Sequence, residues 1–85
     1  MAGEITPCPW DAIDGFASHS EFQRFCDWIK NVVEDGKAKK VPVMKRYQGI
    51  ESFTEEWYHH IESKTTWRLV HPDGPFRGLF ERVID

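Results

Sequence analysis

The chain has 85 residues, of which 40% are hydrophobic, 29% charged and 14% aromatic, and its formal net charge is −3. This length accommodates one domain and leaves no room for a second core. The mildly acidic balance exerts no long-range attraction on a polyanion, so we expect neither nucleic acid nor an anionic membrane as a partner. The high aromatic share favours a small, well-filled core, because each buried ring removes a large apolar area from water.

Cysteine usage and hydropathy indicate the compartment. Cys8 and Cys26 are the only cysteines, too few for the disulfide frameworks typical of small secreted domains. The first ten residues show neither the basic segment nor the apolar run of a signal peptide, and no apolar stretch approaches the roughly 20 residues that span a bilayer. We therefore expect a cytoplasmic protein with both thiols reduced.

Residues 1–17 contain Pro7, Pro9 and Gly15 and show no periodicity, which predicts an irregular arm. Trp10 is the largest apolar side chain of this arm, and we expect it to anchor the arm to the core.

A helix is predicted over residues 18–35. Ser18 with Glu21 three positions later forms a capping box at its start, and Gly36 suits the left-handed position after its end. Apolar residues recur at helical spacing and fall on one face: Phe22, Phe25, Cys26, Ile29, Val32 and Val33. Residues 37–50 are predicted as a loop or an edge strand, because Pro42 cannot donate to a central ladder.

Residues 54–84 alternate apolar and polar side chains, which predicts three consecutive antiparallel strands. A two-residue Asp73-Gly74 loop would pair Leu69 with Gly78 in the second hairpin. The predicted fold class is therefore α+β, with one long N-terminal amphipathic helix packed on a three- to four-stranded antiparallel β-meander.

The register of the first hairpin decides which side chains face the helix. The favoured register places six apolar side chains on that face: Trp57, Ile61, Trp67, Leu69, Phe76 and Phe80. A two- or four-residue loop would instead align Tyr58 and His60 with Trp67 and Leu69, because a slip by one residue exchanges the two faces. The first arrangement is preferred because it gathers more apolar residues.

The opposite face of this predicted sheet alternates charged or polar with apolar side chains: Tyr58, His60, Arg68, Val70, Arg77, Leu79 and Glu81. A solvent-facing side of an antiparallel sheet is normally polar, whereas this one is half apolar. Three explanations stay open: coverage by the arm, self-association, or a partner-binding site that uses Arg and Tyr, residue types enriched at interface hot spots.

The histidines form no compact metal-binding motif. The adjacent His59 and His60 point to opposite faces of a regular strand. His59 and His71 are weak candidates for a shared metal site with Glu55, but their spacing lacks a motif such as HExxH. Cys26 lies within the apolar stripe, where a thiol behaves as a small hydrophobe. We therefore expect no metal, no cofactor and no catalytic residue.

These observations favour a small soluble protein-binding module that acts by stoichiometric binding to a protein partner. Size and acidic charge suggest a bacterial immunity- or antitoxin-type inhibitor, by analogy alone. Two alternatives stay open. One is a small enzyme or metal-binding domain that uses the sheet histidines, and the other is an accessory domain whose second face is buried in a homodimer.

Overall fold

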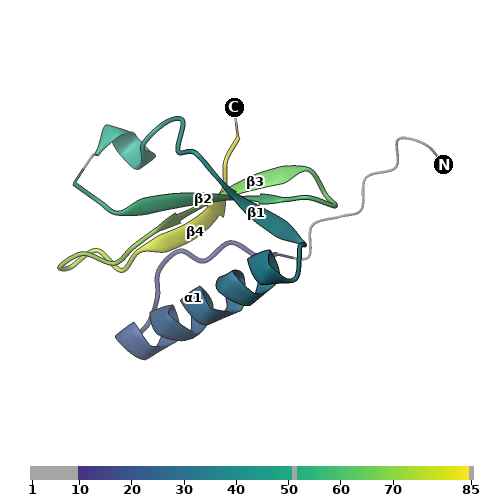
Figure 1. Cartoon of the computed structure of the whole chain (residues 1–85). Coiled ribbons are helices and arrows are strands. Elements are labelled where there is room, and N and C mark those ends of the chain that lie inside the picture. Colours follow the sequence, from purple (N-terminus) through teal and green to yellow (C-terminus); the bar gives the residue numbers. More distant parts are fainter. Residues whose placement is uncertain (1–9, 51, 85) are drawn as a thin grey trace.

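The computed structural model describes residues 10–50 and 52–84. It contains one α-helix, four strands and a short 3-10 helix: α1 (His19–Glu34), β1 (Ala38–Val41), η1 (Tyr47–Gly49), β2 (Glu55–His60), β3 (Thr65–Val70) and β4 (Leu79–Arg82). The strands form one antiparallel sheet in the order β1-β2-β3-β4 (Figure 1). The predicted α+β class, one helix packed on an antiparallel meander, is therefore confirmed. The first nine residues of the predicted arm, Cys8 among them, lie outside the described residues.

Local signals determine both ends of α1. The Ser18 side chain accepts a hydrogen bond of 3.1 Å from the Glu21 N–H, as in a capping box. The Glu21 carboxylate accepts one from Ala17, a residue earlier than that motif specifies. Gly36, at φ 79°, ends the helix in a Schellman motif whose two hydrogen bonds are both present.

The core lies between α1 and one face of the sheet, which we call the helix face. Its buried members come from the arm, the helix and all four strands: Trp10, Phe16, Phe22, Ile29, Ala38, Tyr58, Trp67, Leu69 and Phe80. The predicted anchor, Trp10, is only 9% exposed. Nearby, Ile13 and Phe80 exchange two backbone hydrogen bonds of 2.8 and 2.9 Å, so the arm covers part of the outer edge of β4.

The favoured register of the first hairpin was wrong. Residues 61–64 form a four-residue loop, which pairs Tyr58 with Trp67 and His60 with Thr65. Tyr58 and His60 therefore lie on the helix face, and Trp57 lies on the opposite face. Trp57 is nevertheless buried, with 6% exposed. Both faces of the sheet bury apolar side chains, so a count of apolar residues did not discriminate between the two registers.

The second hairpin is shifted by two residues from the prediction. Asp73 bridges Phe76, so Gly74 and Pro75 form the loop, and Leu69 pairs with Phe80. Because side chains alternate with a period of two, this even shift changes the partners but keeps Leu69 and Phe80 on the helix face.

A second layer covers the other side of the sheet. The connection between β1 and β2, of which residues 42–50 and 52–54 are described, passes over that side and carries η1, opposite α1 (Figure 1). We call these residues the covering loop and the side beneath them the loop face. Within residues 37–50, predicted as a loop or an edge strand, the edge strand is β1, which ends just before Pro42. The covering loop, predicted as a loop or an edge strand but not as a cover, thus gives the sheet a second buried face.

Candidate partner-binding surface

The structure distributes the seven predicted partner-binding residues over different surfaces. Two are buried on the helix face: Tyr58 and His60. Four lie on the loop face: Arg68, Val70, Leu79 and Glu81. Of these, Val70 and Leu79 are only 0% and 6% exposed. Arg77 lies in the β3–β4 connection, beside Gly15 of the arm. The single mixed surface expected from the sequence therefore does not exist in that form.

The weak metal-site candidates His59 and His71 lie on opposite sides of the sheet. His59 lies on the loop face, where its Nδ1 is 3.1 Å from the Thr66 hydroxyl. His71 lies on the helix side, with its ring against Phe22 and its Nε2 2.9 Å from a Glu56 oxygen. Within residues 10–50 and 52–84, no three or more His, Cys, Asp or Glu side chains gather in a way that suits a metal ion.

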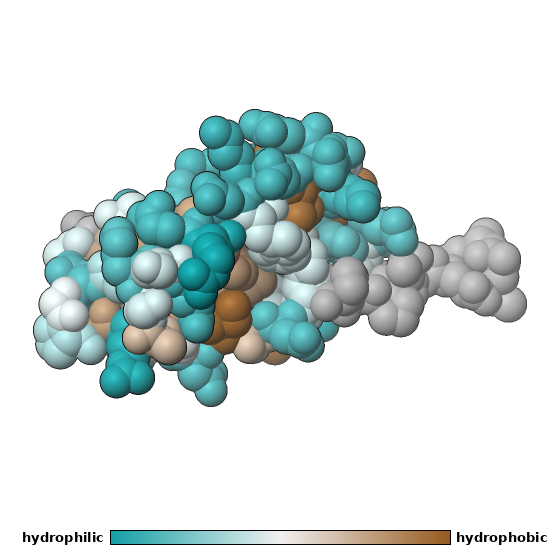
Figure 2. All heavy atoms as spheres, turned by 90° about the horizontal axis from the view of Figure 1, so that it is seen from below, coloured by the Kyte–Doolittle hydropathy of each residue, from teal (hydrophilic) through white to brown (hydrophobic). Residues whose placement is uncertain are grey.

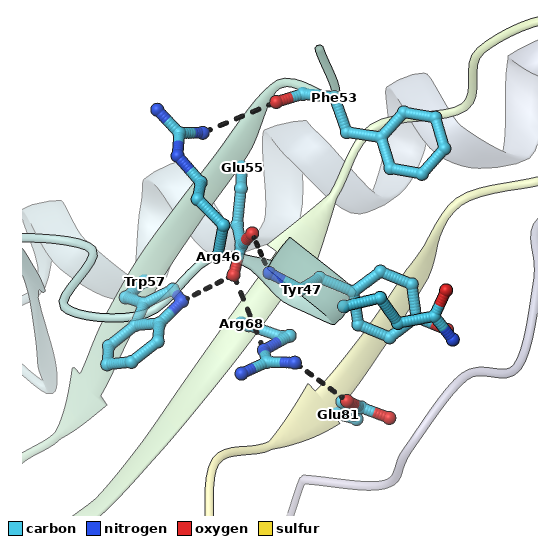
Figure 3. A network of polar contacts seen from close by, with 8 residues as sticks. Arg46, Tyr47, Phe53, Glu55, Trp57, Arg68 and Glu81 are labelled. Carbon is cyan, nitrogen blue, oxygen red and sulfur yellow. Dashed lines mark hydrogen bonds and ion pairs between the residues drawn. The ribbon is translucent and has the colours of Figure 1, made fainter. Parts of the chain in front are cut away.

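A buried charge network fastens the covering loop to the sheet (Figure 3). The Glu55 carboxylate is fully buried and accepts two hydrogen bonds of 2.7 Å, from the Tyr47 backbone N–H and from the Trp57 indole N–H. Arg68 Nε lies 3.4 Å from the same carboxylate, and another nitrogen of that guanidinium lies 3.4 Å from Glu81. A buried carboxylate is tolerated only when it is paired and hydrogen-bonded in this way.

Two aromatic rings complete the surroundings of Arg68. Its guanidinium lies 5.5 Å from the centre of the Tyr47 ring and 5.7 Å from that of Trp57, within the range of cation–π attraction. Its side chain is only 13% exposed. Arg68 is therefore mainly an internal support of the covering loop, rather than the exposed anchor that the sequence suggested.

Glu55 and Tyr47 were not predicted as members of this network. The only local signal is that Glu55 and Trp57 are two residues apart in a strand and so share a face. Nothing in that pattern indicates a third layer that would bury the carboxylate.

Beside this network the loop face is hollowed. One hollow, of about 350 Å³, is bordered by β1 and the start of the covering loop, and a second, of about 370 Å³, lies between η1 and the C-terminal residues. They share Trp57, and we call them together the basic groove. Its cationic residues are Lys39, Lys45, Arg46 and Arg68, and its main apolar residues are Val41, Met44, Trp57, Val83 and Ile84. None of the described residues that line it carries a carboxylate.

The basic groove belongs to a wider separation of charge along the chain. Residues 10–35, the arm and α1, contain six carboxylates and two basic residues. The described residues from 36 onward contain nine basic residues and five carboxylates, of which Glu55 is buried in its ion pair. The arm and α1 therefore form an acidic layer, whereas the described sheet and covering loop together carry more basic than acidic residues, and each part can attract a partner of opposite charge.

A second titratable cluster lies on the helix side of the sheet edge. Glu56 accepts hydrogen bonds from Lys40 and His71. Burial acts to raise the pKa of Glu56, but these two partners outweigh it, and the net pKa is lowered. Burial, followed by the nearby Glu56 carboxylate, raises the pKa of Tyr58 to about 12. Burial, followed by the carboxylates of Glu56 and Asp27, also raises the pKa of Cys26, which favours the less reactive thiol.

Comparisons of the chain with protein-family models, with curated proteins and with solved structures give no match. The fold and its surfaces therefore define the class by themselves: a small α+β domain with a three-layer arrangement of helix, antiparallel sheet and covering loop. No helix in the described part of the chain is both long and apolar enough to cross a membrane.

Proposed function

We propose that the protein is a binding module that holds an acidic segment of a partner protein in the basic groove. The observation that carries this proposal is the composition of the groove. In a chain of net charge −3, its described lining includes three exposed Lys or Arg residues, Lys39, Lys45 and Arg46, besides the paired Arg68, and no carboxylate. Such a groove attracts negative charge, which accelerates encounter with an acidic partner and disfavours basic ones.

Exposed apolar side chains favour a protein as the occupant. Met44 lines the first hollow and Ile84 the second. They are 80% and 82% exposed, the highest values among the exposed large hydrophobic residues of the described chain. Methionine and arginine are enriched at the centres of protein interfaces, where apolar side chains of the partner are buried. We therefore expect a segment in which apolar anchors alternate with carboxylates.

The aromatic residues of the groove are less suited to binding nucleic acid than to binding a protein. Base stacking requires an open ring face, whereas Trp57 is 6% exposed and has the Arg68 guanidinium over its ring. The more specific role predicted from size and charge, an immunity- or antitoxin-type inhibitor, stays a prediction.

Charge reversal in the groove tests the proposal. A photo-crosslinking residue at position 44 would identify the partner in cells, and the same residue in place of Ile61, exposed but at the β2–β3 turn, is the control. The dissociation constant of the identified partner is then measured for the wild type, for Lys39→Glu with Lys45→Glu, and for Lys30→Glu with Lys64→Glu. Both double variants replace exposed lysines and change the net charge equally.

We expect the groove variant to weaken binding at least about tenfold and to reduce its salt dependence, while the control variant binds like the wild type. The crosslinked segment should be rich in Asp and Glu. Equal effects of the two double variants would contradict the site. Crosslinking of the chain to itself would favour the homodimeric accessory domain, and crosslinking to RNA or DNA would favour a nucleic-acid role.

A further inference from the structure

A hollow of about 290 Å³ on the helix side of the molecule is lined by four aromatic rings: Trp10, Phe25, Trp28 and Phe80. Asp11 and Ile13 complete the lining. It lies between the arm and α1, in the acidic layer, and shares no lining residue with the basic groove. Figure 2 views the molecule from this side and shows weakly polar and hydrophobic residues at the surface among strongly hydrophilic ones.

The four rings form a closed circuit of contacts. Trp28 meets Trp10 with ring centres 5.6 Å apart and meets Phe25 at 5.3 Å. Phe80 closes the circuit at 4.7 Å from Phe25 and 5.7 Å from Trp10. Neighbouring rings are inclined by 51 to 73°, so no two of them are stacked in parallel. These packed, mutually tilted rings border the hollow, which we call the aromatic bowl.

The exposure of Trp28 distinguishes this hollow from an ordinary aromatic core. Trp10 and Phe80 are 9% and 1% exposed, as core rings are, but Trp28 is 41% exposed. Tryptophan is highly buried on average, and an indole left open on the rim of an aromatic bowl is available to a ligand.

The charge around the bowl selects the kind of ligand. Aromatic faces carry a negative quadrupole and attract cations. Asp11 adds a carboxylate to the lining, and the layer around it has six carboxylates and two basic residues. An unmodified ammonium is strongly hydrated, whereas methyl groups make the cation larger and easier to transfer into an apolar bowl. Recognition of methylated ammonium by several aromatic rings is an established use of cation–π attraction.

We infer that this hollow binds a quaternary or methylated ammonium group, with Trp10, Phe25 and Trp28 around the methyl groups and Asp11 beside the charge. A volume near the lower end of the roughly 300–1,000 Å³ range of ligand pockets suits one small head group. Two sources share this chemistry: the trimethyllysine side chain of a protein, and choline or a choline-bearing molecule.

Titration of the full-length protein tests the inference. The indole N–H resonances of Trp10 and Trp28 are followed while choline, a trimethyllysine peptide, the same peptide with unmodified lysine, or 3,3-dimethylbutanol is added. The last compound is the neutral carbon isostere of choline, so it separates cation–π attraction from burial of methyl groups. We expect saturable shifts with choline or the trimethyllysine peptide, and binding at least about tenfold weaker with the isostere and with unmodified lysine. The tighter of the two methylated probes identifies the source.

Substitutions locate the site. Trp28→Ala and Asp11→Asn should each weaken binding of the methylated probe about fivefold or more. Asp14→Asn, an exposed carboxylate of the same arm that does not line the hollow, is the matched control and should bind like the wild type. Circular dichroism checks the fold of each variant. If Trp28→Ala does not fold, the result for Asp11→Asn alone tests the site.

Three results would overturn the inference: no saturable shift with either methylated probe, equal affinity for the neutral isostere, or an equal loss from Asp14→Asn and Asp11→Asn. The groove variant Lys39→Glu with Lys45→Glu should leave ammonium binding unchanged, since it lies on the other layer. A negative result for the basic groove therefore does not bear on the aromatic hollow, and a negative result for the hollow does not bear on the groove.

Discussion

The backbone N–H of Tyr47 donates a hydrogen bond of 2.7 Å to the buried carboxylate of Glu55, and this bond joins the covering loop to the first residue of β2. The same carboxylate is held by the Trp57 indole and faces Arg68. Since the covering loop also carries Met44 and Lys45, the shape of the basic groove depends on a charge that no solvent reaches.

Neutralising this charge should destabilise the protein. Glu55→Gln keeps the shape of the side chain but leaves Arg68 opposite a neutral amide, which we expect to lower the free energy of unfolding by about 1–3 kcal/mol. Glu62→Gln removes an exposed carboxylate and should stay within about 0.5 kcal/mol of the wild type. Urea denaturation of both variants is the measurement. Equal stability of the two would show that the buried pair does not hold the covering loop.

The second hairpin should tolerate no side chain at Gly78. Its φ is 77°, and a Cβ there would lie 2.7 Å from the Val70 carbonyl oxygen and 2.9 Å from the Pro72 ring. Gly74, at φ 60°, has open space around it. We expect Gly74→Ala to cost about 1 kcal/mol from backbone strain alone, and Gly78→Ala at least about 2 kcal/mol. Similar melting temperatures of the two variants would contradict this register.

Tyr58 should ionise at a higher pH than an ordinary tyrosine, and the stability of the protein should therefore fall with rising pH in the alkaline range. Its pKa is about 12 in the folded protein, raised by burial and by the Glu56 carboxylate above the ordinary value of 10.0. A raised folded pKa means that the contribution of Tyr58 to stability is complete below pH 10 and is lost as the pH rises toward 12. Absorbance of tyrosinate should show a step near pH 12 that Tyr58→Phe removes and Tyr47→Phe retains. A Tyr58 step at its ordinary value would refute the buried placement of the hydroxyl.

Glu56 should make the stability of the protein fall as the pH is lowered in the acid range. Its pKa is lowered below the ordinary 4.5, so its contribution is present above that pH and is lost as the pH falls through the lower folded value. Glu56→Gln should therefore cost about 1 kcal/mol at neutral pH, and this cost should shrink in acid. Unfolding free energies of wild type and variant at pH 7 and pH 3 test this. A cost that is constant with pH would mean that the charge of Glu56 contributes nothing.

The prediction for α1 succeeded because its signals are local. Ser18, Glu21 and Gly36 act within a turn of the helix ends, and the apolar stripe needs only the helical period. The observed bounds lie within one residue of those predicted. The strands were recognised for the same reason, since alternation is a property of the strand itself.

The sheet faces were predicted wrongly because they depend on distant residues. The register was chosen by gathering the apolar residues on the face that packs against the helix, and coverage of the other face was left open between the arm, a second copy and a partner. In the structure the covering loop buries the other face as well, so Trp57 and Val70 are both buried opposite the helix. The residues proposed as one surface were consequently divided between two layers.

By itself, the sequence determined the fold class, the helix with its caps and the presence of the strands, because helical periodicity, strand alternation and turn chemistry act over a few residues. Only the tertiary structure decided the hairpin registers, the burial of Glu55 against Arg68, and the assembly of the aromatic hollow from Trp10, Phe25 and Trp28 with Phe80. Each of these requires segments far apart in the chain to meet. Such contacts are selected by the packing and desolvation of whole layers, which no short stretch of residues encodes.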